Sequence, residues 1–454
     1  MTSRSNENGR RGKENECSLY DLLVHRFGYG CVYYNPKYVK KGKKEKELAD
    51  IIILALPYAV LIQMKWKDIS SDDISGKNGD VEWKRIVKAL EKAARQFTDF
   101  RTLWEHKAVI NLPQQWSVGG NLRYELDLGL IKQIIPIAIV DFNDVNYCDP
   151  CSRITVPPIV LNVPNSVDKY GSVHSFLLRD FERVVDNFFT IGDLITYLKL
   201  REKQVSEAGK FINYSEMDLF AVFLSHYNLW EDLLRGSFVS IERGAYEGEW
   251  ERNKSLFEER RRIFSREDAV DRILRGSITA FMNAVAPNEL CAEAIRPCLE
   301  FSGRVNCMTS LIKKLVSDKI RYNIDHWVPP EDITEEYRML YSAGRFAETV
   351  LPTTVYLIAV AGFSDRTMTL VVNDVYWRLL GRIRKERKED GVSEVLIVLV
   401  DGHNKRVFPL LRYISKEDYN HAEEYLRQMP KGSQFMVESI LESEWTYAKR
   451  NRER

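Results

Sequence analysis

The sequence predicts an α/β protein whose N-terminal part is a central mixed sheet flanked by helices. Residues 81–104 repeat apolar side chains at helical spacing, which predicts one long helix. Short apolar runs predict four strands around it, at 51–56, 59–65, 134–140 and 156–161. Strands and helices that alternate in this way indicate an α/β domain rather than an all-helical one.

The segments before these strands follow in a simple order. Residues 1–16 are polar and are predicted to be a disordered tail. Residues 18–27 place apolar side chains at helical intervals and predict a helix. The lysine-rich residues 37–46 are expected to connect this helix to the first strand, and Pro57-Tyr58 to form the turn between the two strands. The two strands therefore form a β-hairpin.

The helix predicted at 81–104 follows a polar loop at 68–80 and is amphipathic. One face is apolar and is expected to pack on the sheet. The opposite face is basic and carries Lys84, Lys88, Lys92 and Arg95.

The remaining chain predicts two further domains. We expect a disordered tail at 1–16, the sheet-containing domain at 17–165, a mainly helical domain at 166–346 and a smaller C-terminal α/β domain at 347–454. Helices are expected at 181–189, 192–202, 219–234 and 292–315, the second of them beginning at a Thr190-to-Asp193 start signal. The C-terminal domain is expected to have strands at 353–361, 368–372 and 395–400 and a helix at 376–387.

Composition limits the classes of function. The 454 residues include 66 basic and 65 acidic side chains, a net charge of +1, so nucleic acid can be bound only through local basic patches. The longest apolar stretch, 51–62, is too short to cross a bilayer as a helix, so no membrane association is expected. Seven cysteines are an odd number, which favours reduced thiols and a cytoplasmic location.

Three polar side chains in the hairpin form the candidate site. Asp50 precedes the first strand, and Gln63 and Lys65 are two residues apart on the second, where alternate residues share a face. A tight turn between the strands brings Asp50 beside the other two. Hydrolysis of a phosphodiester needs a divalent cation and a positive group, and the Asp50 and Gln63 oxygens suit Mg²⁺ while Lys65 supplies the charge.

The alternative is that these side chains are merely the solvated ends of a half-buried hairpin. The flanking apolar residues, IIILAL and AVLI, argue against it, because they predict strands that are buried on both faces. Polar side chains are costly in such a place unless they have a function.

The run at 45–68, EKELADIIILALPYAVLIQMKWKD, resembles the PD-(D/E)xK nuclease superfamily. The superfamily pattern is an acid, a hydrophobic hairpin and then acid-x-Lys. Here Ala49 replaces the proline and Gln63 replaces the second acid, as in the Mrr-type and NERD-type branches. The resemblance covers residues 18–140 and implies a restriction-endonuclease-like fold for the N-terminal domain.

The resemblance also implies roles for individual residues. It makes Asp50, Gln63, Lys65 and Glu47 catalytic residues, and Asp50, Gln63 and the backbone carbonyl of Met64 ligands of Mg²⁺ or Mn²⁺. An additional acid often comes from the preceding helix in these nucleases. Glu47 is favoured here for that role, with Asp21 held in reserve and Glu16 as a further alternative.

The helix after the hairpin often faces the substrate in this superfamily. This assigns Lys88, Lys92, Arg95 and Gln96 to nucleic-acid binding, although basic residues on an exposed helix are more often simply solvated.

The sequence therefore predicts a metal-dependent endonuclease, with DNA expected over RNA and with a role in prokaryotic antiviral defence or restriction. The sequence leaves open whether the protein forms homo-oligomers or binds a partner defence protein. The alternative is a catalytically degenerate nuclease-like module that binds nucleic acid or a partner protein, for which Gln63 is the argument. A third possibility is that the C-terminal domain senses a ligand and switches the nuclease on.

Overall fold

The computed structural model describes the larger part of the N-terminal half and separate segments of the C-terminal half. These residues are 2–28, 30–39, 45–67, 79–113, 123–142, 173–208, 216–225, 248–264, 270, 292–325, 343–347, 354–361, 376–377, 380–381, 394–401, 406–428 and 437–439. They belong to two compact units, the first drawn from 1–265 and 283–307 and the second from 266–282 and 308–442. The two are described separately below, and the predicted domain borders stay predictions.

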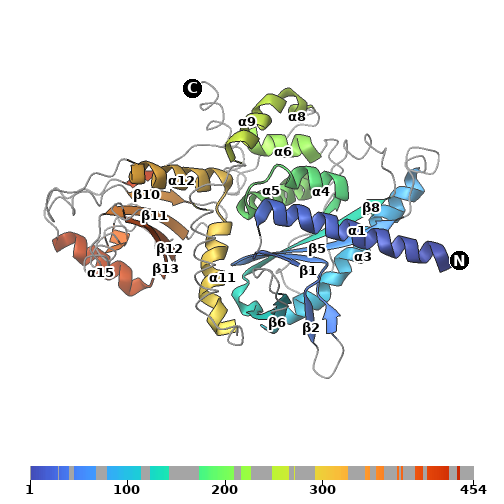
Figure 1. Ribbon diagram of the computed structural model, residues 1–454, viewed down its shortest axis with the longest axis horizontal. Coiled ribbons are helices and arrows are strands. Elements are labelled where there is room, and N and C mark those ends of the chain that lie inside the picture. The colour runs from blue at the N-terminus through green and yellow to red at the C-terminus, as the bar shows by residue number, and fades with distance from the viewer. Residues whose placement is uncertain are drawn as a thin grey trace. The chain divides into compact units, whose positions relative to one another are not determined.

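Unit 1 contains a central five-stranded mixed sheet (Figure 1). Its strands, in spatial order, are β1 (Val32–Tyr34), β4 (Ile51–Ala55), β5 (Tyr58–Lys67), β8 (Gln133–Phe142) and β9 (His174–Leu177). Strand β4 is antiparallel to both of its neighbours, β1 and β5, whereas β5, β8 and β9 run parallel to one another. The predicted α/β class, the central mixed sheet, the hairpin and the 134–140 strand are confirmed. The strand predicted at 156–161 lies outside the described residues.

The prediction that residues 37–46 form a lysine-rich connector is wrong at both ends of this range. Strands β2 (Lys37–Val39) and β3 (Glu45–Glu47) pair with each other there. They belong to a second sheet of order β3-β2-β6-β7, completed by β6 (Val109–Pro113) and β7 (Arg123–Asp127). Backbone pairing of β2 with β3 along its whole length, and with β6 at Lys37, overrides the low strand propensity of a lysine-rich segment.

The disordered tail predicted at 1–16 is also wrong, because helix α1 spans Thr2–Phe27. The predicted part of this helix buries Leu19 and Leu23 completely. The N-terminal extension gains tertiary contacts that its polar composition does not reveal. The Asn15 amide donates to the Asp141 carboxylate at the end of β8, and a Cβ at Gly12 would lie 3.8 Å from Trp66 Cβ on β5. Packing therefore stabilises a segment with weak intrinsic helix propensity.

The long amphipathic helix is confirmed as α3 (Gly79–Glu105). It packs on β5 and β8 through a buried face that includes Ile86, Leu90 and Phe97. The basic face is exposed as expected. Of the loop predicted at 68–80, residues 68–78 lie outside the described part of the chain.

The chain that follows β9 is mainly helical where the structure describes it within unit 1, as predicted. Within unit 1 it contains α4 (Leu178–Val185), α5 (Ile191–Ala208), α6 (Glu216–Ser225), α8 (Glu249–Arg252), α9 (Lys254–Phe264) and α11 (Ala292–Asn306). The helix predicted at 292–315 is instead two helices, α11 and α12 (Ser310–Asp325). The second begins after Thr309, whose carbonyl accepts from Lys313 N and whose residue type favours a helix N-cap. Residues 226–234 of the helix predicted at 219–234 lie outside the described chain.

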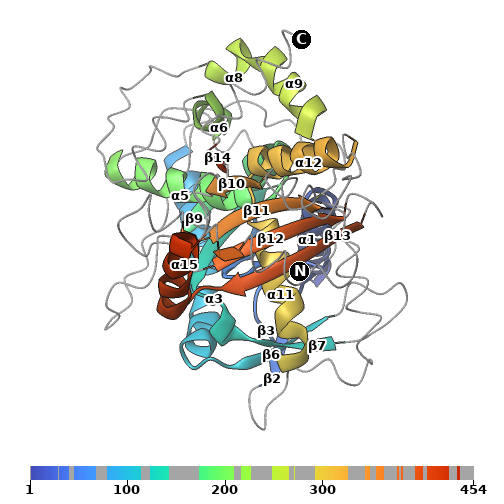
Figure 2. The same cartoon turned by 90° about the vertical axis from the view of Figure 1, so that its left-hand side faces the viewer.

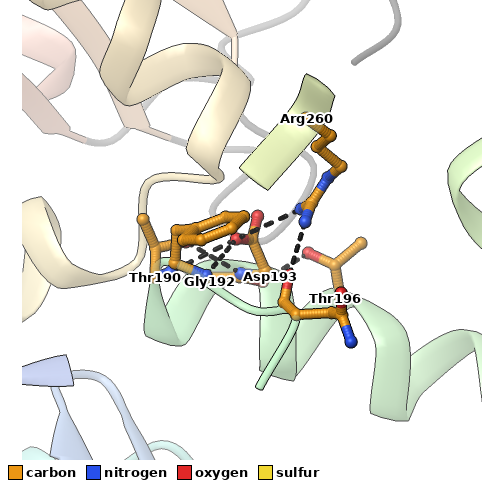
Figure 3. A network of polar contacts seen from close by, with 7 residues as sticks. Thr190, Gly192, Asp193, Thr196 and Arg260 are labelled. Carbon is orange, nitrogen blue, oxygen red and sulfur yellow. Dashed lines mark hydrogen bonds and ion pairs between the residues drawn. The ribbon is translucent and has the colours of Figure 1, made fainter. Parts of the chain in front are cut away.

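The predicted start signal of α5 forms a reciprocal cap (Figure 3). Asp193 Oδ2 accepts from Thr190 N at 3.2 Å, and Thr190 Oγ1 accepts from Asp193 N at 3.1 Å. Arg260 of α9 lies beside this cap, with Nη2 3.9 Å from Asp193 Oδ2, and it also donates to the Asn187 carbonyl. The contacts of Arg260 therefore attach α9 to the residues that cap the N-terminus of α5.

Unit 2 contains α12 and a sheet of order β13-β12-β11-β10-β14 (Figure 2). The strands are β10 (Ala343–Ala347), β11 (Thr354–Ala361), β12 (Glu394–Asp401), β13 (Arg406–Tyr413) and β14 (Val437–Ser439), and α15 spans Lys416–Gln428. Strands β11 and β12 confirm two of the predicted strands. The strand predicted at 368–372 and most of the helix predicted at 376–387 lie outside the described residues. Among the described helices, none is long and apolar enough to span a bilayer.

Candidate active site

The β4–β5 hairpin brings Asp50 beside Gln63, as the sequence predicts. The pairing places Ile51 opposite Ile62, so the residues next to this pair also meet. Gln63 Nε2 donates to Asp50 Oδ1 at 2.6 Å, and the Met64 backbone N–H donates to Asp50 Oδ2 at 2.5 Å. Both carboxylate oxygens of Asp50 are thus attached to β5.

Burial of this carboxylate changes its chemistry. Asp50 and Gln63 are each only 5% exposed, in a hairpin whose apolar residues are buried on both faces. Desolvation raises the pKa of Asp50, while the Met64 N–H, the Lys65 charge and the Gln63 amide act in the opposite direction. These groups offset part of the effect of burial, and the net shift of the Asp50 pKa is upward.

Lys65 shares a strand face with Gln63 and is half-buried. Burial lowers the pKa of its amine, and the charge of Lys92 on α3 adds to this effect. The negative charges of Asp50, Glu16 and Glu47 oppose it. The Lys65 amine therefore holds its proton less firmly than a surface lysine does.

Glu47, the additional acid favoured by sequence, lies near Asp50. Burial and then the Asp50 charge raise its pKa, and the charges of Lys65, Lys37 and Lys13 lower it. In the amide orientation that satisfies its neighbours, Asn35 Nδ2 donates to the Glu47 carboxylate and lies 3.3 Å from the Asp50 carbonyl. Asn35 thus ties the β3 end to the start of β4.

Glu16 of α1 also belongs to this group of acids. Burial, and then the charges of Asp50 and Glu47, raise its pKa to about 7. Asp21, held in reserve by sequence reasoning, is exposed. Helical spacing could have identified Glu16. It lies three residues before the buried Leu19 and seven before the buried Leu23, so it is on the core-facing side of α1. Asp21 does not share that face.

Basic residues surround these acids on several elements. Lys13, Lys37, Lys65 and Lys92 come from α1, β2, β5 and α3, and each contributes electrostatically to one of the groups above. Sequence reasoning missed Lys13 and Lys37, because nothing local links them to the hairpin. Lys88, Arg95 and Gln96 are exposed on the same helix as Lys92, and Arg95 also lies 3.6 Å from Glu91.

The side chains of Glu16, Glu47, Asp50 and Gln63 can each offer an oxygen ligand, which suits a hard divalent cation such as Mg²⁺. Burial and, after it, repulsion between the acids raise the pKa values of Glu16 and Glu47, and a bound cation would relieve the repulsion. In the described conformation, however, no three His, Cys, Asp or Glu side chains of the described chain approach closely enough to hold a metal. The Gln63 amide presents nitrogen rather than oxygen to Asp50.

Comparison of the chain with protein-family models, with curated proteins and with solved structures gave no match. The functional interpretation therefore depends on the motif and on the geometry of this acid centre, which we define as Glu16, Glu47, Asp50, Gln63 and Lys65.

Proposed function

We propose that this protein is a metal-dependent endonuclease of the PD-(D/E)xK type, with a restriction-endonuclease-like N-terminal domain, acting on DNA in preference to RNA. The observation that carries the proposal is the attachment of the Asp50 carboxylate to Gln63 and Met64 on the strand that also bears Lys65. A buried carboxylate, an amide and an amine in this order match the motif. Glu16 and Glu47 beside them supply further acids. Antiviral defence and a cytoplasmic location remain expectations from the same resemblance.

In this proposal Asp50, Gln63 and the Met64 carbonyl hold Mg²⁺ or Mn²⁺, with Glu16 or Glu47 as the additional acid. When bound, the cation polarises the phosphate and lowers the pKa of water. A half-turn of the Gln63 amide exchanges Nε2 for Oε1, so the residue that now donates to Asp50 can serve as an oxygen ligand. Lys65, with its lowered pKa, orients the attacking water and stabilises developing negative charge.

The exposed basic face of α3 is the proposed contact for the phosphate backbone. Lys92 links this face to the acid centre, because its charge contributes to the lowered pKa of Lys65. Lys88, Arg95 and Gln96 extend the same surface along the helix. Contacts of this kind position nucleic acid without reading its sequence.

The second candidate function is a degenerate nuclease-like module that binds nucleic acid or a partner protein. The Gln63 nitrogen that faces Asp50 favours it, and so does the absence, among the described residues, of three acids close enough together to hold a metal. Both candidates allow nucleic-acid binding, so cleavage is the measurement that separates them.

A cleavage assay tests the proposal with the full chain and Mg²⁺ or Mn²⁺, on duplex and single-stranded DNA and on RNA. We expect metal-dependent cutting that EDTA abolishes. The substitutions Asp50→Ala and Lys65→Ala should each reduce kcat/KM by about 100-fold or more, the usual cost of removing an electrostatic group from a catalytic site.

The matched controls are Asp21→Ala and Lys416→Ala, which remove an exposed acid of α1 and an exposed lysine of α15, outside the proposed binding surface. Both should cut at the wild-type rate. Equal cutting by wild type and by the Asp50 and Lys65 variants would overturn the proposal. Binding without cutting would favour the degenerate module.

A further inference from the structure

The end of the β4–β5 hairpin that lies away from Asp50 is held by helix α11. Gly303 of α11 lies directly against the hairpin turn. A Cβ added to this glycine would lie 2.5 Å from both the nitrogen and the oxygen of Leu56, a distance that side-chain atoms do not reach. The contact is therefore between two backbones, and only glycine permits it.

Two hydrogen bonds reinforce the approach of the two backbones. Arg304 Nη1 donates to the Leu56 carbonyl at 2.9 Å, and Cys307 Sγ donates to the Ala55 carbonyl at 3.4 Å. All four residues are buried, with at most 5% of any of them exposed. A buried carbonyl that loses its donor is destabilised, so these bonds oppose movement of the turn. We call Gly303, Arg304 and Cys307 the α11 clamp.

The α11 clamp affects the acid centre because it fixes the register of β4 relative to β5. Asp50 immediately precedes β4, and both hydrogen bonds to its carboxylate come from β5. A shift of β4 along β5 therefore moves Asp50 away from Gln63 and Met64. Helix α11 packs against β4 and also against β7 of the second sheet (Figure 2), so it holds the hairpin against the rest of unit 1.

We propose that α11 is a positioning helix for the acid centre and that Arg304 is its principal positioning residue. Arg304 acts at the turn, and its effect reaches the site as a fixed register between Asp50 and Gln63. The catalytic consequence rests on the proposed nuclease function, whereas the structural consequence does not. Two kinds of measurement therefore test it.

The first measurement is hydrogen exchange at the Met64 amide, which reports the bond to Asp50 whether or not the protein is a nuclease. Arg304→Met, which removes the donor, and Gly303→Ala, which forces the backbones apart, should accelerate exchange at Met64 by about tenfold or more. Arg304→Lys keeps a donor and should restore much of the protection. Arg296→Met is the matched control, because Arg296 lies on the same helix in an exposed pair with Glu300.

The second measurement is cleavage kinetics well below the melting temperature. A loosened site should lower kcat by about tenfold with KM unchanged, since the surface of α3 is untouched. Wild-type exchange and kcat in both folded variants would overturn the proposal. Accelerated exchange in a protein that cuts no nucleic acid would support the clamp and contradict the nuclease function instead.

Wild-type protein gives a decisive result even if the variants fail to fold. In native-state exchange across a denaturant series, the Met64 amide and the amides of α11 should open with the same free energy, as one cooperative unit. Opening of Met64 while α11 stays closed, or the reverse, would overturn the proposal.

Discussion

Two of the groups of charged residues in the described part of unit 1 differ in how their charges are balanced. The acid centre lies at the β4–β5 hairpin and places three acids around one half-buried lysine. The second group, which we call the buried network, lies beside β9 and consists of His174, Asp180, Tyr197, Arg201 and Glu216. Both attach to the same sheet. Only the acid centre is open to solvent through half-buried and exposed side chains.

The buried network is built on one ion pair. Arg201 Nε donates to Glu216 Oε1 at 2.8 Å, and its Nη2 donates to Glu216 Oε2 at 3.1 Å and to the Ser175 carbonyl at 3.0 Å. The Tyr197 hydroxyl also donates to Glu216, and the guanidinium lies 4.0 Å from the centre of the Phe176 ring. The side chains of the ion pair are 0% and 2% exposed, so this is a buried bidentate pair.

The other titratable members of the network are neutral near pH 7. Burial, aided by the charge of Arg201, lowers the pKa of His174 to about 3. Burial, aided by the charge of Glu216, raises the pKa of Asp180 to about 8. The network therefore has one cation and one anion, which compensate each other.

The difference shows which group is structural and which is a candidate for function. Opposite charges in direct contact stabilise a fold against rearrangement, whereas like charges held together cost stability. A protein retains such a cost where chemistry needs it. In the acid centre three acids face one lysine, whereas in the buried network Arg201 and Glu216 form a direct ion pair.

The largest effect is expected from breaking the buried network with Glu216→Gln. The charge of Arg201 would then be buried without its partner, which typically costs about 3–5 kcal/mol of unfolding free energy. Urea denaturation followed by circular dichroism measures it. Glu249→Gln, which breaks a more exposed pair with Arg252, should cost no more than about 1 kcal/mol. Equal losses in the two variants would contradict the comparison.

The acid centre should respond in the opposite direction to Glu16→Gln. The folded-state pKa of about 7 exceeds the value of 4.5 in an unfolded chain, so the unfolded state releases its proton first as pH rises. The resulting loss of stability is absent below pH 4.5, grows between pH 4.5 and 7 and is complete above pH 7. The variant should therefore be more stable than wild type at pH 8 and equal to it at pH 4.5.

Melting temperatures across this pH range test the expectation, with Asp21→Asn as the control on the same helix. The Glu16 variant should also cut more slowly, so that stability rises while activity falls. A stability difference that is independent of pH would contradict the raised pKa of Glu16.

The smallest effect is expected on the exposed basic face. Each phosphate contact contributes about 0.9 to the slope of log K against log salt for duplex DNA. Lys88→Ala combined with Lys92→Ala should therefore reduce that slope by about 1.8 and weaken binding to all sequences alike. Fluorescence anisotropy from low to moderate salt measures it, with the exposed Lys416→Ala of unit 2 as the control. An unchanged slope would mean that this face is merely solvated.

Local pattern by itself determined much of unit 1. The apolar runs around Pro57-Tyr58 specify a hairpin whose register places Asp50 beside Gln63, and helical periodicity specifies α3 with its basic face. The same holds for the cap at Thr190 and Asp193. In each case the interacting residues are close in sequence, or their partner is the nearest strand.

Tertiary structure decided the features that join distant segments. Asn15 and Gly12 extend α1 because they meet β8 and β5, and that extension carries Glu16 to the acid centre in place of Asp21. Lys37 of β2 pairs with Asn111 of the distant β6, which joins the β2–β3 pair to the rest of the second sheet. Arg304 reaches a turn some 250 residues earlier, at Leu56. The physical reason is common to all of them: such contacts depend on which surfaces the fold brings together, and no local periodicity encodes the partner.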